Sequence, residues 1–335
     1  MKKEFDFIRS GLLGLIAADA LGVPAEFRSR DEMFDEPIED MTGFGTHNQP
    51  AGSWSDDSSM TLCTMDSLCR GYDLQDMMQR FCAWMYEDAY TPHGKTFDFG
   101  GITRRALNRF RCGYDPLECG EEDERSNGNG SLMRILPVVF RQYLLSDGFE
   151  DENCAELLHP VWQVSALTHA HPVSTVGCCI YARLIAAVIR AAREKMDKAG
   201  LMNALQDAVY LAWNDQADED AALLSYRRLM DMQAFGALPG HQIKSSGYIV
   251  HTLEAALWCF LNTDSYSKCV LEAVNLGDDT DTVAAVAGSF AGIYYGAETI
   301  PEKWLSCLAR LDWLEERIGR FTRCMEQLKG AKADV

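Results

Sequence analysis

Two short acidic segments carry the side chains in this sequence that are best suited to chemistry. They are Ser55–Asp57 and Asp278–Thr282, and each lies where a glycine-containing loop gives way to a helical pattern. Either segment alone could be an ordinary helix N-cap stabilised by the helix macrodipole. A cap needs only one oxygen side chain, however, whereas each segment has three or more in a row. Crowded carboxylates repel one another unless a cation neutralises them, so the pattern indicates a cation site if the two segments meet.

The expected donors are all oxygen atoms, which favours Mg²⁺ or Mn²⁺ and disfavours zinc and copper. Such a set could hold two ions about 3.5 to 4 Å apart that share a carboxylate. We expect the Asp279 and Asp281 carboxylates to lie on the same side of an extended turn, with Thr282 capping the following helix. The candidate metal ligands are Ser55, Asp56, Asp57, Asp279, Asp281 and Thr282.

Helical periodicity dominates the rest of the chain and predicts the elements that must position these residues. Apolar residues recur at helical spacing over 58–70, 75–89, 183–196, 201–213, 248–262, 282–296 and 302–328. Sustained two-residue alternation is absent, so we predict an all-α fold. The 282–296 segment is apolar nearly all round and should lie at its centre. Long loops are predicted over 28–54, 91–101 and 112–131, and loops of such length are usually functional.

Composition narrows the class of protein further. The 335 residues are 47% hydrophobic and carry a formal charge of -19, which repels nucleic-acid backbones and anionic lipid surfaces. No uninterrupted apolar run of about 18 residues exists, so we expect no membrane span. The apolar run 11–18 follows acidic residues and is interpreted as the first helix rather than a signal peptide.

Cysteine usage and organisation along the chain predict a simple architecture. The 12 cysteines form no C-x-x-C pair, and several lie in apolar periodic segments. We therefore expect reduced, mostly buried thiols and a cytoplasmic protein. Neither a fixed-period repeat nor a low-complexity linker is found, so residues 1–335 are expected to form a single domain, and we expect a monomer.

Seven short motifs follow one another along the chain. They are Asp19-Ala20-Leu21-Gly22 with Glu26, Trp54–Ser58, Phe97–Gly100, Asn127–Arg134, Thr168-His169, Ser245–Tyr248 and Gly277–Thr282. In this order they resemble the motifs of the ADP-ribosylglycohydrolases, particularly the type that removes ADP-ribose from arginine and activates dinitrogenase reductase. The resemblance spans most of the chain, from Gly11 to about Gly296. It implies a compact, orthogonal multi-helix bundle with two Mg²⁺ or Mn²⁺ ions that hydrolyses the glycosidic bond of an ADP-ribosylated protein.

The same resemblance implies roles for individual residues. It makes the six oxygen side chains above the metal ligands, and it makes Glu26 and Asp98 the catalytic candidates, with their division of labour left open. Without it, Glu26 would be a solvated acid and Asp98 a turn former. The implied substrate-binding residues, which include a glycine-rich cradle for a pyrophosphate and Tyr248 for stacking, are Gly101, Ile102, Thr103, Asn129, Gly130, Ser131, Met133, His169, Gly247 and Tyr248.

Other functions compatible with these residues remain open at this point. They are a non-catalytic ADP-ribose-binding or crystallin-like protein on the same fold, and a hydrolase of another ADP-ribosyl linkage, such as serine or O-acetyl-ADP-ribose. A two-metal nucleotide pyrophosphatase is disfavoured because the chain has no His-Asp dipeptide and its E-x-x-E matches fall in broken loops. The acidic residues outside the site, including the run 121–124, are interpreted as solvated surface.

Overall fold

The computed structural model describes residues 4–146, 148–149, 154–216 and 219–333, which form α-helices joined by loops and 3₁₀ turns. Within these ranges there is no strand, only three isolated bridges, and the all-α prediction is confirmed. The helices are α1 (Asp6–Gly22), α2 (Arg30–Asp35), α3 (Asp56–Leu68), α4 (Leu74–Glu87), α5 (Gly101–Arg111), α6 (Leu136–Leu145), α7 (Ala155–Ala166), α8 (Pro172–Glu194), α9 (Lys198–Asp215), α10 (Asp220–Leu223), α11 (Met232–Gly236), α12 (Ile249–Asn262), α13 (Tyr266–Asn275), α14 (Thr280–Tyr295), α15 (Glu302–Cys307) and α16 (Leu311–Ala333).

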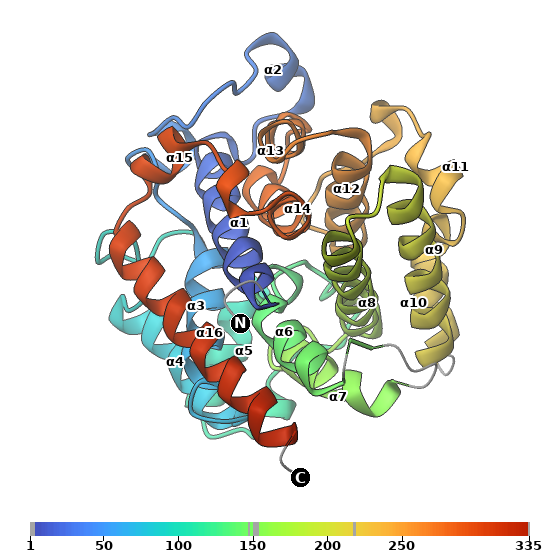
Figure 1. Ribbon diagram of the computed structural model, residues 1–335. Coiled ribbons are helices and arrows are strands. Elements are labelled where there is room, and N and C mark those ends of the chain that lie inside the picture. Colours follow the sequence, from blue (N-terminus) through green and yellow to red (C-terminus); the bar gives the residue numbers. More distant parts are fainter. Residues whose placement is uncertain (1–3, 147, 150–153, 217–218, 334–335) are drawn as a thin grey trace.

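Helices α1 and α14 pack against each other at the centre of the molecule (Figure 1). Their backbones approach so closely that a Cβ on Gly14 would lie 2.4 Å from the Gly288 carbonyl oxygen, and one on Gly292 would lie 2.3 Å from that of Ser10. All residues of α14 from Thr280 to Ile293 are buried. The small residues of 282–296 therefore serve close packing from several sides, as the sequence predicted.

The prediction of a single helix over 302–328 is wrong, because the structure has two helices there, α15 and α16. The chain breaks between α15 and α16, where Arg310 adopts a left-handed backbone with φ +53°. The break is fastened to two loops: the Ala309 N–H donates to the Gly52 carbonyl at 3.0 Å, and the Arg310 guanidinium donates to the Thr91 carbonyl at 2.9 Å. Tertiary contacts thus override a continuous helical pattern.

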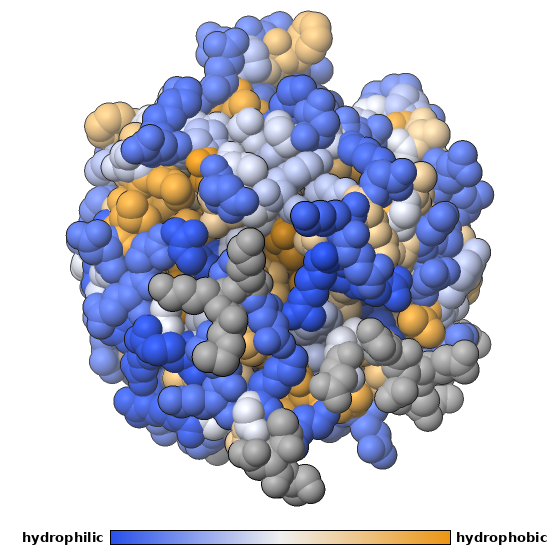
Figure 2. Space-filling view, viewed as in Figure 1, coloured by the Kyte–Doolittle hydropathy of each residue, from blue (hydrophilic) through white to orange (hydrophobic). Residues whose placement is uncertain are grey.

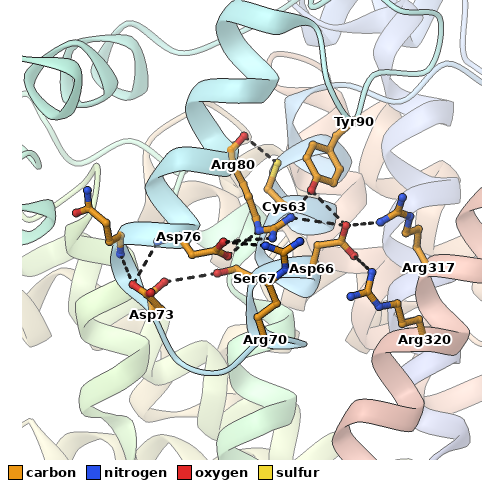
Figure 3. A network of polar contacts seen from close by, with 11 residues as sticks. Cys63, Asp66, Ser67, Arg70, Asp73, Asp76, Arg80, Tyr90, Arg317 and Arg320 are labelled. Atoms are coloured by element: carbon orange, nitrogen blue, oxygen red, sulfur yellow. Dashed lines mark hydrogen bonds and ion pairs between the residues drawn. The ribbon is translucent and has the colours of Figure 1, made fainter.

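Helix α16 is anchored on α3 by a buried carboxylate (Figure 3). Asp66, 4% exposed, accepts a hydrogen bond from the Tyr90 hydroxyl at 3.2 Å and pairs with Arg317 and Arg320 of α16. Arg80 of α4 lies 3.9 Å from the same carboxylate. This network connects the C-terminal helix to the helix that begins with Asp56.

Several elements fall outside the sequence-based expectations. Helix α2 lies inside the predicted loop 28–54 and begins with a capping box in which Ser29 and Glu32 bond reciprocally. Helices α5, α6, α7 and α13 were not among the predicted helices. The pattern of α5 is weak because only Thr103, Ala106 and Leu107 of its residues are buried, and α7 contains an internal proline, Pro160.

Burial explains the long apolar helices, and the surface is mostly polar. By length and composition two segments could cross a membrane, Asp6–Ala25 and Pro172–Glu194, and 94% of each is buried inside the protein, as in core helices. Polar side chains cover most of the face seen in Figure 2, with small apolar areas between them. No disulfide bond joins any of the cysteines in the described part of the chain.

Candidate active site

The two acidic helix starts meet, as the sequence predicted. The Thr282 hydroxyl of α14 donates to Asp57 Oδ1 of α3 at 3.4 Å, which joins segments 225 residues apart. Ser55 is the N-cap of α3 and accepts from the Asp57 N–H, while Asp279 occupies the N-cap position of α14. The expected extended turn and the capping role of Thr282 are wrong, because Asp281 and Thr282 already lie in the first turn of α14.

Asp19, near the end of α1, holds the start of α3 in place. Its buried carboxylate accepts hydrogen bonds from the Ser55 N–H at 3.0 Å, from the Ser58 N–H at 3.1 Å and from the Ser58 hydroxyl. Burial raises its pKa to about 6. No role was predicted for Asp19, because its partner Ser55 lies 36 residues away in the chain.

Among the residues that the structure describes, no cationic side chain forms an ion pair with the buried carboxylates of the two helix starts. Burial first, and repulsion from neighbouring carboxylates second, raise the pKa of Asp56, Asp57 and Asp281 well above the ordinary value. Two buried oxygen atoms, Asp57 Oδ2 and Asp279 Oδ1, have no hydrogen-bond partner. Unsatisfied buried carboxylate oxygens are costly unless a cation binds them.

This donor set therefore fits a hard divalent cation. Oxygen atoms of Glu26, Asp279 and Asp281 all lie within 4.8 Å of one another, close enough to share an ion. Ser55, Asp56 and Thr282 add hydroxyl and carboxylate oxygens at the same two helix starts. Oxygen ligands of this kind are those that Mg²⁺ and Mn²⁺ prefer.

Glu26 and Asp98, the two catalytic candidates, lie together on the rim of this acidic centre. Burial raises the pKa of Glu26 to about 7 and also raises the pKa of Asp98. Asp98 adopts a left-handed backbone with φ +49°, and the exposed residues Phe27 and Phe99 directly follow the two acids. The 26–27 and 98–99 segments thus each place an acid inward and an aromatic ring outward.

His47, which the sequence analysis missed, contacts Glu26. Its Nε2 binds the Glu26 carboxylate, and His47, Glu26 and Asp98 offer ligand atoms within 4.8 Å of one another. The hydrogen bond to Glu26 raises the pKa of His47. The expected donor set consisted of oxygen atoms alone, whereas the structure places the His47 imidazole beside Glu26 and Asp98. A single histidine in a glycine-containing loop carries no sequence signal for this contact.

A cavity of about 310 Å³ opens beside the acids. It is lined by Glu26, Asp56, Asp98, Asp279 and Thr282, and by the two phenylalanines. Ser55, Asp57 and Asp281 lie buried behind this wall. Eight of the ten predicted substrate-binding residues also line the cavity, namely Gly101, Ile102, Thr103, Asn129, Gly130, Met133, His169 and Gly247.

Ser131 and Tyr248, the other two predicted substrate-binding residues, are not on the cavity wall. The Ser131 hydroxyl points into the core, where it accepts a hydrogen bond from Ser165 at 2.9 Å. Tyr248 is the N-cap residue of α12, and its ring packs edge-on against His251. Its backbone pairs with Gly128, so Tyr248 supports the glycine-rich loop rather than lining the cavity.

Arg134 supports the glycine-rich loop, residues 127–131, through several hydrogen bonds. This buried guanidinium donates to the Gly130 carbonyl, to the Val164 carbonyl at 3.1 Å and to the Thr168 hydroxyl at 2.8 Å. Asn129 donates to Asp279 Oδ2 at 2.7 Å, which connects the loop to the acidic centre. The loop is therefore fixed before any ligand binds.

The same network sets the protonation of His169. Thr168 accepts a hydrogen bond from Arg134 at 2.8 Å, and its hydroxyl lies 2.7 Å from His169 Nδ1. When this hydroxyl donates to Nδ1, the neutral His169 ring carries its proton on Nε2. Burial lowers the His169 pKa to about 3, so the ring is neutral. A neutral ring with an Nε2–H donor facing Gly128 and Gly130 can hydrogen-bond a phosphate oxygen.

Glu121 corrects the interpretation of the run 121–124 as solvated surface. Its side chain is 8% exposed and accepts from Arg105 at 2.6 Å, with Arg109 at 3.5 Å. The Ala170 N–H donates to the Glu121 carbonyl at 3.0 Å, so the loop is fastened beside His169. Glu121 is thus structural, whereas the following acids are exposed.

An all-α fold with an acidic centre of oxygen atoms beside a ligand-sized cavity fits the class of proteins that bind a small ligand next to a divalent cation. The family model for ADP-ribosylglycohydrolase matches residues 1–331. The chain belongs to the ADP-ribosylglycohydrolase family, which confirms the resemblance seen in the motifs.

Individual relatives cover nearly the whole chain. ADP-ribosylarginine hydrolase Tri1 of Pseudomonas putida (strain GB-1) is 33% identical over 92% of this chain and 76% of its own length. The ADP-ribosyl-[dinitrogen reductase] glycohydrolase of Rhodospirillum rubrum is 28% identical over 91% and 90%. A solved structure, an ADP-ribosylglycohydrolase-related protein complex, superposes with a TM-score of 0.75 at 31% identity, covering 97% of this chain and 100% of that one.

Proposed function

We propose that this protein hydrolyses the N-glycosidic bond between ADP-ribose and an arginine side chain of a modified protein, with two Mg²⁺ or Mn²⁺ ions at the acidic centre. The observation that carries the proposal is the pair of helix starts whose buried carboxylate oxygens, Asp57 Oδ2 and Asp279 Oδ1, lack partners beside a cavity. Arginine is the favoured acceptor because two relatives named ADP-ribosylarginine hydrolase, 33% and 29% identical, cover most of the chain.

The cavity divides the ligand between two regions of different charge. Asn129, Gly130 and the Nε2–H of His169 bind the pyrophosphate without a formal positive charge. The N-terminus of α5, which begins after Gly100 without a side-chain cap, adds free backbone N–H groups. The distal ribose then lies at the acidic end, next to Glu26 and Asp98.

The two catalytic acids perform complementary work at the anomeric carbon. Glu26, with a pKa of about 7, accepts a proton from the attacking water at neutral pH. Asp98 faces the positive charge that develops as the bond to the guanidine nitrogen breaks. When bound, divalent cations would orient the ribose hydroxyls and the water and lower the pKa of that water.

The acceptor should lie at the mouth, where the leaving group departs. Phe27 and Phe99, 68% and 40% exposed, line the cavity directly beside the two acids. Aromatic faces next to carboxylates suit a planar, delocalised cation such as guanidinium. A serine or acetyl acceptor would gain nothing from this surface.

An acceptor panel tests the proposal. We expect ADP-ribosylarginine peptide to be hydrolysed with a kcat/KM at least tenfold above those of ADP-ribosylserine peptide and O-acetyl-ADP-ribose, in the presence of Mg²⁺ or Mn²⁺. Preferred cleavage of either other linkage would move the assignment to that acceptor. Tight ADP-ribose binding with no turnover of any linkage would favour a binding protein on this fold.

A further inference from the structure

The loop residues 44–49 form a closed turn, here called the 44–49 turn, that rests on Glu26. The Phe44 N–H donates to the Gln49 carbonyl at 2.5 Å and closes the turn. Phe44, Gly45 and Asn48 have φ values of +71°, +54° and +53°. Positive φ values strain the backbone of the two non-glycine residues, Phe44 and Asn48. A Cβ on Gly45 would lie 2.0 Å from the Pro24 carbonyl oxygen, so only glycine lets the turn approach this closely.

Two adjacent residues of the turn hold Glu26 at two points. The Thr46 hydroxyl donates to the Glu26 carbonyl oxygen at 2.6 Å, and His47 Nε2 binds the Glu26 carboxylate. Both side chains in this second contact are largely buried, 14% exposed for His47 and 7% for Glu26. One contact therefore fixes the backbone of Glu26 and the other fixes its carboxylate.

The His47 ring also separates the two segments that carry the catalytic acids. Its centroid lies 6.0 Å from that of Phe27, next to Glu26, and 5.5 Å from that of Phe97, next to Asp98. Atoms of Glu26, His47 and Asp98 fall within 4.8 Å of one another. The ring thus sets the spacing of the two acids as well as the direction of one of them.

We propose that His47, carried by the strained 44–49 turn, is a positioning residue that orients the Glu26 carboxylate toward the reacting centre. The expected effect on kcat rests on the proposed function, whereas the contacts of His47 with Glu26 do not depend on it. Strain stored in the turn is compatible with such a role, because strained backbone persists only where surrounding contacts hold it. A small misplacement of a catalytic base lowers kcat more than it lowers substrate affinity.

Two substitutions separate the ring from its hydrogen bond. His47→Phe keeps an aromatic ring between Phe27 and Phe97 but removes the contact to Glu26, whereas His47→Gln keeps a side-chain hydrogen-bond donor. We expect His47→Phe to lower kcat by about tenfold or more, with the Kd for ADP-ribose changed less than twofold, and His47→Gln to recover part of kcat. The control is His241→Phe at an exposed histidine off the cavity wall, with unchanged kinetics.

A second measurement needs no turnover. Hydrogen exchange of peptides that cover 23–30 and 43–50 should be faster in His47→Phe and in Thr46→Val than in the wild type and in His241→Phe. Unchanged exchange in both variants would overturn the proposal, as would an unchanged kcat in His47→Phe. A Kd for Mn²⁺ raised tenfold in His47→Gln but unchanged in Glu26→Gln would make His47 itself a metal ligand and would also overturn the proposal. A wild type that hydrolyses no ADP-ribosylarginine would refute the proposed function alone, because the exchange result would still decide the role of His47.

Discussion

The Thr282 hydroxyl lies 3.4 Å from Asp57 Oδ1, and this contact brings together two helix starts that are 225 residues apart. Each segment alone is a helix start with several oxygen side chains, of which only Ser55 caps its helix. Together they bury several carboxylates around oxygen atoms that have no partner. The chemistry of the site therefore depends on α3 and α14 meeting at their N-termini, where the helix dipoles also favour negative charge.

Divalent cations should stabilise the fold more at pH 8 than at pH 5. The pKa values of Asp56, Asp57 and Asp281 are raised in the folded, metal-free protein. The folded state therefore keeps protons that the unfolded chain releases, and metal-free stability falls as pH rises above the ordinary Asp value of 3.8. Thermal midpoints measured with and without Mn²⁺ at both pH values test this, and an equal shift at both would contradict it.

Removing one buried charge should stabilise the metal-free protein and abolish its response to metal. Asp57→Asn keeps an oxygen acceptor for Thr282 but removes a charge from a fully buried position. We expect a gain of about 1 to 3 kcal/mol in the free energy of unfolding at pH 8 without metal. Urea unfolding of this variant and of the exposed-site control Asp312→Asn provides the comparison. A destabilised Asp57→Asn protein would argue against an unneutralised acidic centre.

A methyl group on Gly130 should obstruct the ligand cavity. Its Cβ would lie 2.7 Å from Cε1 of His169, closer than real Cβ contacts, whereas a Cβ on Gly128 would lie 3.5 Å from the same ring, an ordinary contact. Overpacking of this kind costs about 1 to 3 kcal/mol, so Gly130→Ala should weaken ADP-ribose binding about tenfold or more. Gly128→Ala should have a clearly smaller effect in the same calorimetric titration. Equal effects would place the ligand elsewhere.

Neutral His169 should make the fold sensitive to acid. Its pKa is lowered from 6.5 to about 3 by burial, so the unfolded chain binds a proton between these values while the folded protein does not. Stability from this group is complete above pH 6.5 and is lost as pH falls, by about 2 kcal/mol at pH 5. The unfolding free energy at pH 8 minus that at pH 5 should therefore be about 2 kcal/mol lower in His169→Gln than in the wild type. An unchanged difference would mean that His169 is protonated in the fold.

The parts of this protein that could be predicted from sequence are those encoded locally. Two of these features can be recognised within a few residues of sequence. They are the clustered oxygen side chains at helix starts and the Ala- and Gly-rich run 282–296. The composition of 91–101 also predicted the loop that carries Asp98. In each case the pattern and the structural cause lie in the same short segment.

The residues that escaped prediction depend on contacts between distant segments. His47 reaches Glu26 only because three left-handed residues close the 44–49 turn. Asp19 lies in an apolar helix, and its carboxylate accepts a hydrogen bond from the Ser55 N–H only when α3 packs beside that helix. The motif resemblance placed Ser131 in the substrate site, whereas in the structure its buried hydroxyl accepts a hydrogen bond from Ser165. No local pattern reports such pairings.

The most direct test of the account is release of ADP-ribose from an ADP-ribosylarginine protein, followed with and without added Mg²⁺ or Mn²⁺. The wild type should release ADP-ribose only when a divalent cation is present. Asp57→Asn, while folded, should lose at least a hundredfold in kcat/KM, equivalent to about 2.7 kcal/mol of transition-state stabilisation. Full activity in the presence of excess EDTA, or an Asp57→Asn protein as active as the wild type, would contradict a metal-dependent hydrolase built on these two helix starts.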